Sequence, residues 1–219
     1  MSRLLKFCCL LLIVLVPRYS CAQGRDTAYC AETHTFHLTG LIAPTTLIGL
    51  GSLGTFTPYL HDKNVVLRDW VQSDNHNKLH FDDYVQYAPA ASIYALKLCG
   101  LESKHNYRDI TNLMAATYIT TAILNLSTKW TFDFERPNGG GLSFPSGHTA
   151  TAFAGAEMLR REYGEEYPLV GIAGYVVATS VGCMRIYNNA HWAADVLAGA
   201  GIGILSASIA YWLAPYLRF

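Results

Sequence analysis

The chain has 219 residues, of which 51% are hydrophobic and 15% charged, and its formal net charge is zero. This length suits one domain with a sizeable core. A balanced charge gives no electrostatic reason to expect a nucleic-acid partner, so we expect none. The apolar composition is compatible with contact with a membrane.

The first 22 residues have the pattern of a secretory signal peptide. Arg3 and Lys6 precede an apolar run over residues 7–16, and Ser20 and Ala22 provide small residues before a cut at Gln23. An uncleaved anchor is the alternative, but so short a run is poorly suited to cross a bilayer. We therefore predict an exported protein of the cell envelope, with a signal peptide at 1–22 and a single domain at 23–219.

Six apolar segments of helical length follow, separated by polar joints and without the alternation typical of strands. They cover residues 41–60, 81–100, 109–130, 146–163, 168–184 and 192–213. This pattern predicts an all-α bundle of about six helices, embedded in or associated with a membrane.

Three of these segments, 109–130, 168–184 and 192–213, come near the length that a spanning helix needs. Segment 41–60 contains Pro44 and Pro58, which favours a surface-lying or re-entrant element instead. The stretch VVLRDWVQSD that follows can form an amphipathic helix at the interface. A wholly extracytoplasmic, soluble helical domain is the alternative.

Basic residues in the joints after 81–100 and after 146–163 predict that these two joints lie on the cytoplasmic side. The joints after 109–130 and after 168–184 then lie together on the opposite side. Cys99 and Cys183 fall in apolar segments, and we interpret them as small buried residues. The histidines of the polar joints are interpreted as solvent-exposed and form no zinc site: His34, His37, His61, His76, His80 and His105.

The two joints on the predicted outer side carry an unusual set of polar residues. The first joint contains KWTFDFERP followed by PSGH, and the second contains RIYNNAHWAAD. The residues that could converge there are Lys129, Arg136, Ser146, Gly147, His148, Arg185, His191 and Asp195.

Three cations that converge on one point repel one another unless an anion lies between them. Lys129, Arg136 and Arg185 match the geometry of a tetrahedral phosphate. Ser146 is a good N-cap, and Gly147 in the first turn of a helix would let the backbone approach an oxyanion. The alternative for Lys129 and Arg136 is that they are interfacial residues at a helix end.

His191 and Asp195 are four residues apart and share one helix face. Asp195 can keep one imidazole nitrogen protonated, which leaves the other as a nucleophile for phosphorus. His148 can then act as the general acid for the leaving oxygen. Neither a metal ion nor a cofactor is required. The alternative is an ordinary surface pair, although a lone carboxylate in an apolar helix needs a partner.

The three motifs K-x6-R-P, P-S-G-H and R-x5-H-x3-D, in this order, resemble those of the type 2 phosphatidic acid phosphatase superfamily. The resemblance implies that His191 forms a phosphohistidine supported by Asp195 and that His148 is the acid. It also implies that phosphate is bound by Lys129, Arg136, Ser146, Gly147 and Arg185. One departure is Met184, which stands where the family usually has a serine.

The function predicted in this way is that of a metal-independent phosphatase acting on a lipid phosphate or pyrophosphate, with its active site facing the periplasm. Candidate substrates that the family implies include lipid A phosphate, undecaprenyl pyrophosphate and phosphatidic acid. The alternatives are a soluble periplasmic acid phosphatase with broad specificity, a vanadate-dependent haloperoxidase and a helical scaffold without activity. The sequence indicates no oligomeric state.

Overall fold

The structure, a computed structural model, describes residues 38–73 and 78–214, and within these ranges it contains only helices. The elements in chain order are η1 (Leu38–Leu41), α2 (Ile42–Phe56), α3 (Pro58–Gln72), α4 (Asp82–Val85), α5 (Ala88–Leu98), α6 (Tyr107–Phe132), α7 (Gly147–Tyr163), α8 (Pro168–Tyr187) and α9 (Ala193–Leu213). The predicted signal peptide, His34, His37 and His76 lie outside the described residues.

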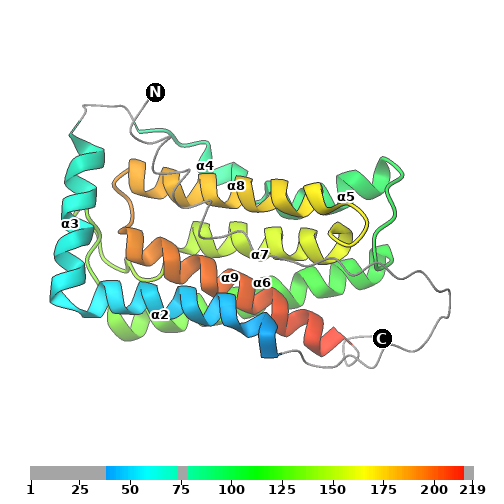
Figure 1. Cartoon of the computed structure of the whole chain (residues 1–219), viewed down its shortest axis with the longest axis horizontal. Coiled ribbons are helices and arrows are strands. Elements are labelled where there is room, and N and C mark those ends of the chain that lie inside the picture. The colour runs from blue at the N-terminus through cyan, green and yellow to red at the C-terminus, as the bar shows by residue number, and fades with distance from the viewer. Residues whose placement is uncertain (1–37, 74–77, 215–219) are drawn as a thin grey trace.

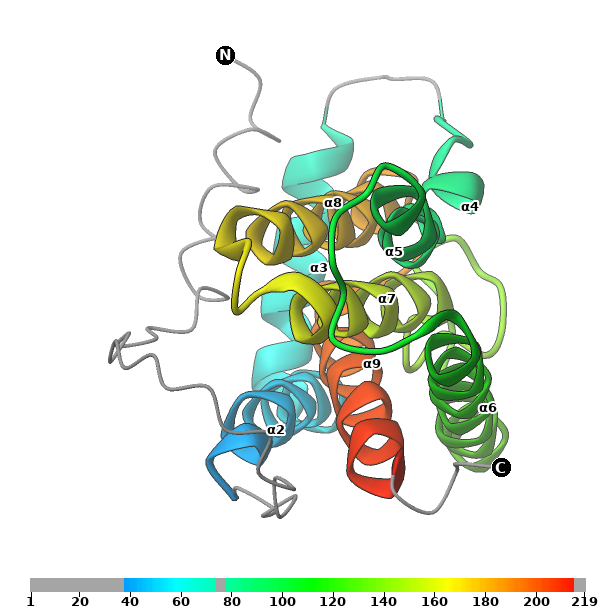
Figure 2. The same ribbon diagram turned by 90° about the vertical axis from the view of Figure 1, so that its right-hand side faces the viewer.

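The long helices run side by side along the bundle, with α7 at the centre (Figures 1 and 2). Helix α7 packs against α5, α6, α8 and α9, while α2 packs along the other side of α9. These are α2 and the five helices from α5 to α9, so the predicted all-α bundle of about six helices is confirmed.

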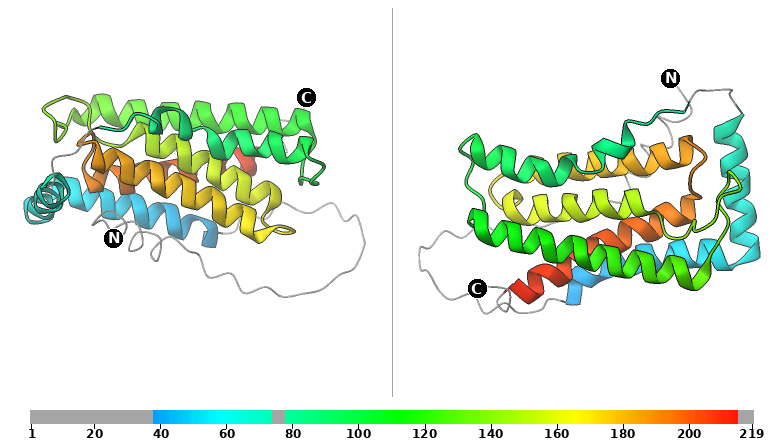
Figure 3. Two further views of the ribbon diagram at one scale, coloured as in Figure 1. Left: turned by 90° about the horizontal axis from the view of Figure 1, so that it is seen from above. Right: turned by 180° about the vertical axis from the view of Figure 1, so that it is seen from behind.

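Helix α3 lies across one end of this bundle (Figures 1 and 3). The α6–α7 joint and the α8–α9 joint meet at this same end, as the sequence predicts. The side chain of Asn64 on α3 accepts a hydrogen bond from the backbone N–H of Ala194 at 3.2 Å, and that of Gln72 donates to the carbonyl of Tyr187 at 2.9 Å. Helix α3 therefore braces the α8–α9 joint from outside.

Glycines on α9 allow the central helices to approach closely. A methyl group added at Gly199 or Gly203 would collide with the backbone carbonyl of Ser146 or Ala150 on α7. Gly201 makes the same close approach toward α2. Small residues at these positions bring the backbones of helices near each other, which is typical of helix packing in membranes. This contact holds the first turn of α7 against α9.

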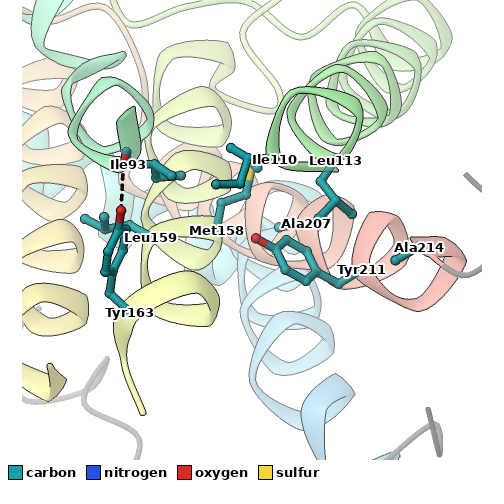
Figure 4. Packing of buried hydrophobic residues seen from close by; sticks show 9 residues of the cluster. All are labelled: Ile93, Ile110, Leu113, Met158, Leu159, Tyr163, Ala207, Tyr211 and Ala214. Atoms are coloured by element: carbon teal, nitrogen blue, oxygen red, sulfur yellow. Dashed lines mark hydrogen bonds between the residues drawn. The ribbon is translucent and has the colours of Figure 1, made fainter. Parts of the chain in front are cut away.

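The larger hydrophobic cluster lies at the end of the bundle away from α3, between α5, α6, α7 and α9 (Figure 4). It consists of Ile93, Ile110, Leu113, Met158, Leu159, Tyr163, Ala207, Tyr211 and Ala214. The hydroxyl of Tyr163 donates to the carbonyl of Ile93 at 2.8 Å, which ties α7 to α5. The apolar core therefore stabilises one end and leaves the other for polar groups.

The structure contradicts the re-entrant form of segment 41–60. Helix α2 is continuous along α9, and with η1 it is one of three helices long and apolar enough to cross a membrane. The surface-lying form stays a prediction. Pro44 lies in the first turn of α2, where its missing N–H has no intrahelical partner to lose, and Pro58 begins α3. The other two candidate spans are α8 and α9, as predicted, whereas α6 does not reach the same hydropathy.

Three smaller predictions are also wrong. Segment 81–100 is divided into α4 and α5, because Pro89 cannot donate the N–H that would continue α4. Cys99 is exposed at the end of α5, although Cys183 is buried as predicted. His105 is half-buried rather than exposed, and its Nδ1 lies 2.8 Å from Oε1 of Glu162. His61 is half-buried against the ring of Trp192.

Candidate active site

Lys129 lies in the last turn of α6 and points into the joint that follows. It is only 9% exposed, which excludes the alternative of an interfacial lysine extending into solvent. Its ammonium group donates to the carbonyls of Leu142 and Ser143. Arg136, Arg185 and Asp195 all lie within electrostatic range of it. Lys129 therefore closes the α6–α7 joint and places a cation beside the start of α7.

Arg136 lies in the α6–α7 joint and is half-buried. Its Nε donates to the carbonyl of Gly141 at 3.1 Å, which holds the guanidinium over the glycine-rich turn. Burial lowers the pKa of Arg136, and the nearby charge of Arg185 lowers it further. The cations of the two joints are thus close enough to repel each other, as expected for a site that binds an anion.

The first turn of α7 begins at the predicted N-cap residue, Ser146. The backbone N–H of Ser146 donates to the carbonyl of Asp195 at 3.0 Å, and its fully buried hydroxyl is 2.9 Å from that of Thr149. The hydroxyl of Ser146 is therefore engaged within the protein, and its predicted contact with phosphate stays a prediction. The N–H groups of Gly147 and His148 belong to the first turn, which has no intrahelical acceptors.

Gly147 is not required by the packing of the chain. A methyl group added there would meet Oδ1 of Asn125 at 3.6 Å, an ordinary van der Waals distance, and no closer atom of a neighbouring segment. Glycine in the first turn of a helix costs backbone entropy. No atom of the described residues explains this glycine, which favours a ligand against the helix N-terminus.

Two carboxylates of α4 pair with the predicted site residues. Asp82, which is 1% exposed, accepts a hydrogen bond from NH1 of Arg185 at 2.7 Å. Oδ1 of Asp83 lies 2.8 Å from Nε2 of His148 and 3.7 Å from NH1 of Arg185. Helix α4 therefore orients one cation and one histidine of the site.

His191 and Asp195 lie side by side at the α8–α9 joint. Nδ1 of His191 is 3.4 Å from Oδ2 of Asp195, and both residues are almost fully buried, which excludes the alternative of a surface pair. The same oxygen accepts hydrogen bonds from the hydroxyl of Ser143 at 2.5 Å and from the backbone N–H of Trp192 at 3.0 Å. These donors fix the carboxylate that the sequence leaves without a partner.

The environment keeps the imidazole of His191 neutral. Burial lowers the pKa of His191 to about 4, and the charges of Lys129 and Arg136 also lower it, although Asp195 raises it. A neutral imidazole with Nδ1 toward a carboxylate leaves Nε2 with its lone pair. The arrangement can therefore present a nucleophilic nitrogen at neutral pH.

Three residues of this cluster were missed by the sequence reasoning. Asp82 and Asp83 are acidic residues in the first turn of a helix, where such residues are common. Their sequence position therefore gives no sign of their contacts with α7 and α8. Ser143 lies in a polar loop and gives no signal of its own. Met184, which replaces the family's usual serine, is 7% exposed. Within residues 38–73 and 78–214 there is no cluster of histidine, cysteine or carboxylate side chains that could hold a metal ion.

The chain is similar to known proteins in sequence and in fold. The PAP2 superfamily model matches residues 108–219. A lipid A 1-phosphatase of Porphyromonas gingivalis is 51% identical over 90 residues, which are 41% of this chain and 20% of that protein. The chain thus aligns with about a fifth of the length of that relative.

Two solved structures are similar. The crystal structure of Aquifex aeolicus LpxE matches with a TM-score of 0.52 and 25% identity, over 68% of this chain and 94% of that one. A transmembrane PAP2-type phosphatidylglycerolphosphate phosphatase from Bacillus subtilis matches with a TM-score of 0.57 and 19% identity, over 80% and 98%. The second similarity concerns the fold alone. On the family match over half of its length, the chain belongs to the PAP2 superfamily.

Proposed function

We propose that this protein is a phosphatase that removes a phosphate group from a lipid through a phosphohistidine on His191. The observation that carries the proposal is the convergence of three cations, a helix N-terminus and a buried His191–Asp195 pair at one end of an apolar bundle. A tetrahedral dianion is the ligand whose charge and shape match that set of donors.

In the first step, Nε2 of His191 attacks phosphorus while Asp195 stabilises the positive charge that develops on the imidazole. The bond between phosphorus and the ester oxygen breaks, and His148 donates a proton to that oxygen, so an alcohol leaves. Lys129, Arg136 and Arg185 stabilise the charge on the equatorial oxygens.

In the second step, a water molecule attacks the phosphohistidine. His148, which has lost its proton, accepts one from this water, and the bond between phosphorus and nitrogen breaks. Inorganic phosphate leaves and both histidines return to their starting states. No step needs a metal ion, because the side chains supply the positive charge.

A lipid is favoured as the substrate by the surface of the bundle and by the relatives. Large apolar side chains are exposed along α2, α6 and α8, for example Leu53, Ile123 and Ile172. A soluble phosphatase would expose such a surface to water, so this alternative is disfavoured. The relative that is 51% identical over 90 residues is a lipid A 1-phosphatase, and lipid A 1-phosphate is the first substrate to offer.

The proposal is tested by phosphate release from the purified chain in detergent with EDTA, with a lipid phosphate and a water-soluble monoester offered side by side. We expect release from the lipid, and its loss in His191→Ala. His80→Ala, which removes an exposed histidine outside the site, is the matched control. An acid-labile, base-stable phosphoprotein after rapid quenching would identify the phosphohistidine. Faster release from the soluble ester would refute the lipid substrate, and activity in His191→Ala would refute the nucleophile.

We propose further that the site faces the periplasm. Lys97, Lys104 and Arg108 at the opposite end support this orientation, because cytoplasmic joints are enriched in basic residues. Helix α3 carries Lys63 and Arg68 at the site end, so charge alone is a weak guide and a direct test is needed.

The direction of α2 constrains this orientation. Phe56 at the end of α2 contacts Phe132 and Phe134 near the site, so the start of α2 lies at the far end. If α2 crosses the membrane, its start and the site lie on opposite faces. A periplasmic site would then put the start of α2 on the cytoplasmic face, which is incompatible with signal cleavage before Gln23.

Cysteine labelling distinguishes these cases. In right-side-out vesicles, a membrane-impermeant maleimide should label Asn138→Cys in the α6–α7 joint, in a chain whose other cysteines are serine. A second chain keeps Cys99, which is exposed at the opposite end, as its single cysteine, and labelling of this residue would mean that α2 does not cross and would favour the cleaved signal. Protection of Cys99 would favour a spanning α2. Protection of Asn138→Cys together with labelling of Cys99 would refute the periplasmic site.

A further inference from the structure

A buried amide on α6 has no role in the chemistry described above. Asn125 precedes Lys129 by four residues, one helical turn, and shares the buried face of α6 with it. It is 6% exposed. Thr117 and Thr121 continue the same face toward the centre of the bundle.

The amide nitrogen of Asn125 is unsatisfied. Among the described residues, its Nδ2 has no hydrogen-bond partner, although the atom is fully buried. A buried donor without an acceptor destabilises a folded chain, and native proteins rarely retain one without a reason. Thr121, one turn away, differs because its hydroxyl donates to the carbonyl of Thr117 at 2.8 Å.

The position of this amide relates it to the helix N-terminus. Oδ1 of Asn125 lies 3.6 Å from the point that a methyl group on Gly147 would occupy, and it is the sole side-chain atom from another element within 4 Å of that point. The open space beside Gly147 is therefore bounded by Asn125. Lys129 lies one turn further along the same face, nearer the joint.

We propose that Asn125 is a further phosphate-binding residue, whose amide N–H donates to a phosphate oxygen held against the first turn of α7. This inference rests on the proposed function, because a phosphate is the ligand that it completes. A neutral amide adds a donor without adding a fourth positive charge beside Lys129, Arg136 and Arg185. The same carboxamide borders the position that a side chain at 147 would occupy.

Two substitutions separate binding from folding. Asn125→Ala removes the amide, and Asn125→Asp keeps its shape but replaces the donor with a negatively charged acceptor. Thr121→Ala is the matched control, since it removes a buried polar group one turn away on the same face. The measurements on the full chain in detergent are the inhibition constant of inorganic phosphate, kcat/KM for the lipid phosphate, and the rise in melting temperature that phosphate causes.

We expect Asn125→Ala to weaken phosphate binding about tenfold, the usual effect of losing one hydrogen bond to a charged acceptor. Asn125→Asp should weaken it more, because its carboxylate repels phosphate. Thr121→Ala should stay within about twofold of the wild type, since it changes packing and not the donor set. The melting temperature of Asn125→Ala without phosphate should not fall below that of Thr121→Ala.

Wild-type phosphate affinity in both Asn125 variants would overturn this inference while leaving the proposed function intact. If Asn125→Ala does not fold, Asn125→Asp alone decides the question. A wild-type chain that neither releases nor binds phosphate would instead overturn the proposed function, and this inference with it.

Discussion

The buried nucleophile makes a quantitative prediction about pH. Burial lowers the pKa of His191 from 6.5 to about 4 in the folded chain. Between these values the unfolded chain binds a proton that the folded chain does not, so the free energy of unfolding should fall as the pH falls. One pKa unit corresponds to about 1.4 kcal/mol, so His191 should cost roughly 3 kcal/mol of stability between pH 6.5 and pH 4. Above pH 7 it should contribute no pH dependence.

The assay is the difference between the wild type and His191→Gln in thermal unfolding in detergent, followed from pH 7.5 to pH 4. Other titrating groups are common to both proteins and largely cancel in the difference. We expect the wild type to lose stability relative to the variant only below about pH 6.5. A difference that does not change with pH, or one that changes in the opposite direction, would refute the reasoning that His191 is buried in its neutral form.

Three further predictions concern the neighbours of this histidine. Gly147→Ala should leave the melting temperature unchanged or raise it, because the packing has room for a methyl group. It should lower kcat/KM at least tenfold, because the methyl group fills the space beside phosphate. A fall in melting temperature together with the fall in kcat/KM would contradict this prediction. Ser143→Ala removes a charge-assisted hydrogen bond to Asp195 and should cost about 2 kcal/mol in unfolding and about tenfold in kcat; an unchanged kcat would mean that Asp195 is positioned without it. Asp83→Asn should slow the hydrolysis of an alkyl phosphate more than that of an aryl phosphate, because an aryl leaving group depends less on protonation by His148. Equal slowing of both substrates would argue against a role of Asp83 in acid catalysis by His148.

The sequence predicts which candidate residues lie close together where they are near each other along the chain. His191 and Asp195 are four apart and lie close together, with Nδ1 of His191 3.4 Å from Oδ2 of Asp195, although His191 precedes α9 and does not share a helix face with Asp195. Ser146 is the N-cap residue of α7 as predicted, although its side chain makes no capping hydrogen bond. Apolar length predicts α8 and α9 as candidate spans in the same way. The match to the PAP2 superfamily confirms the resemblance that these motifs indicate.

The sequence fails where a residue's role depends on a distant segment. Asp82 is separated from Arg185 by 103 residues and Ser143 from Asp195 by 52, so no periodic pattern relates them. From the sequence alone His105 looks like an exposed loop residue, because its partner Glu162 is distant along the chain. Pro44 leads to the opposite error, in which a local signal is given too much weight. Proline interrupts the interior of a helix but is tolerated in its first turn, and the sequence does not show which turn Pro44 occupies.

The two ends of the bundle differ in how many of their buried polar atoms have hydrogen-bond partners, and this difference supports a bound ligand at the site end. At the far end Glu162 is satisfied by His105 and Tyr211, with no atom left over. Eight buried side-chain atoms among the described residues have no hydrogen-bond partner, and most belong to the site end: Asn125 Nδ2, Arg185 Nε, Asn189 Oδ1, His191 Nδ1 and Asp195 Oδ1. Folding alone gives no reason to leave unsatisfied groups together, since each destabilises the chain. A bound phosphate supplies acceptors for the donors among them, and a positive charge on His191 during the reaction would draw its Nδ1 proton onto Asp195. The unsatisfied donors, Asn125 Nδ2 and Arg185 Nε, are therefore best explained as the protein's half of an interaction that the substrate completes.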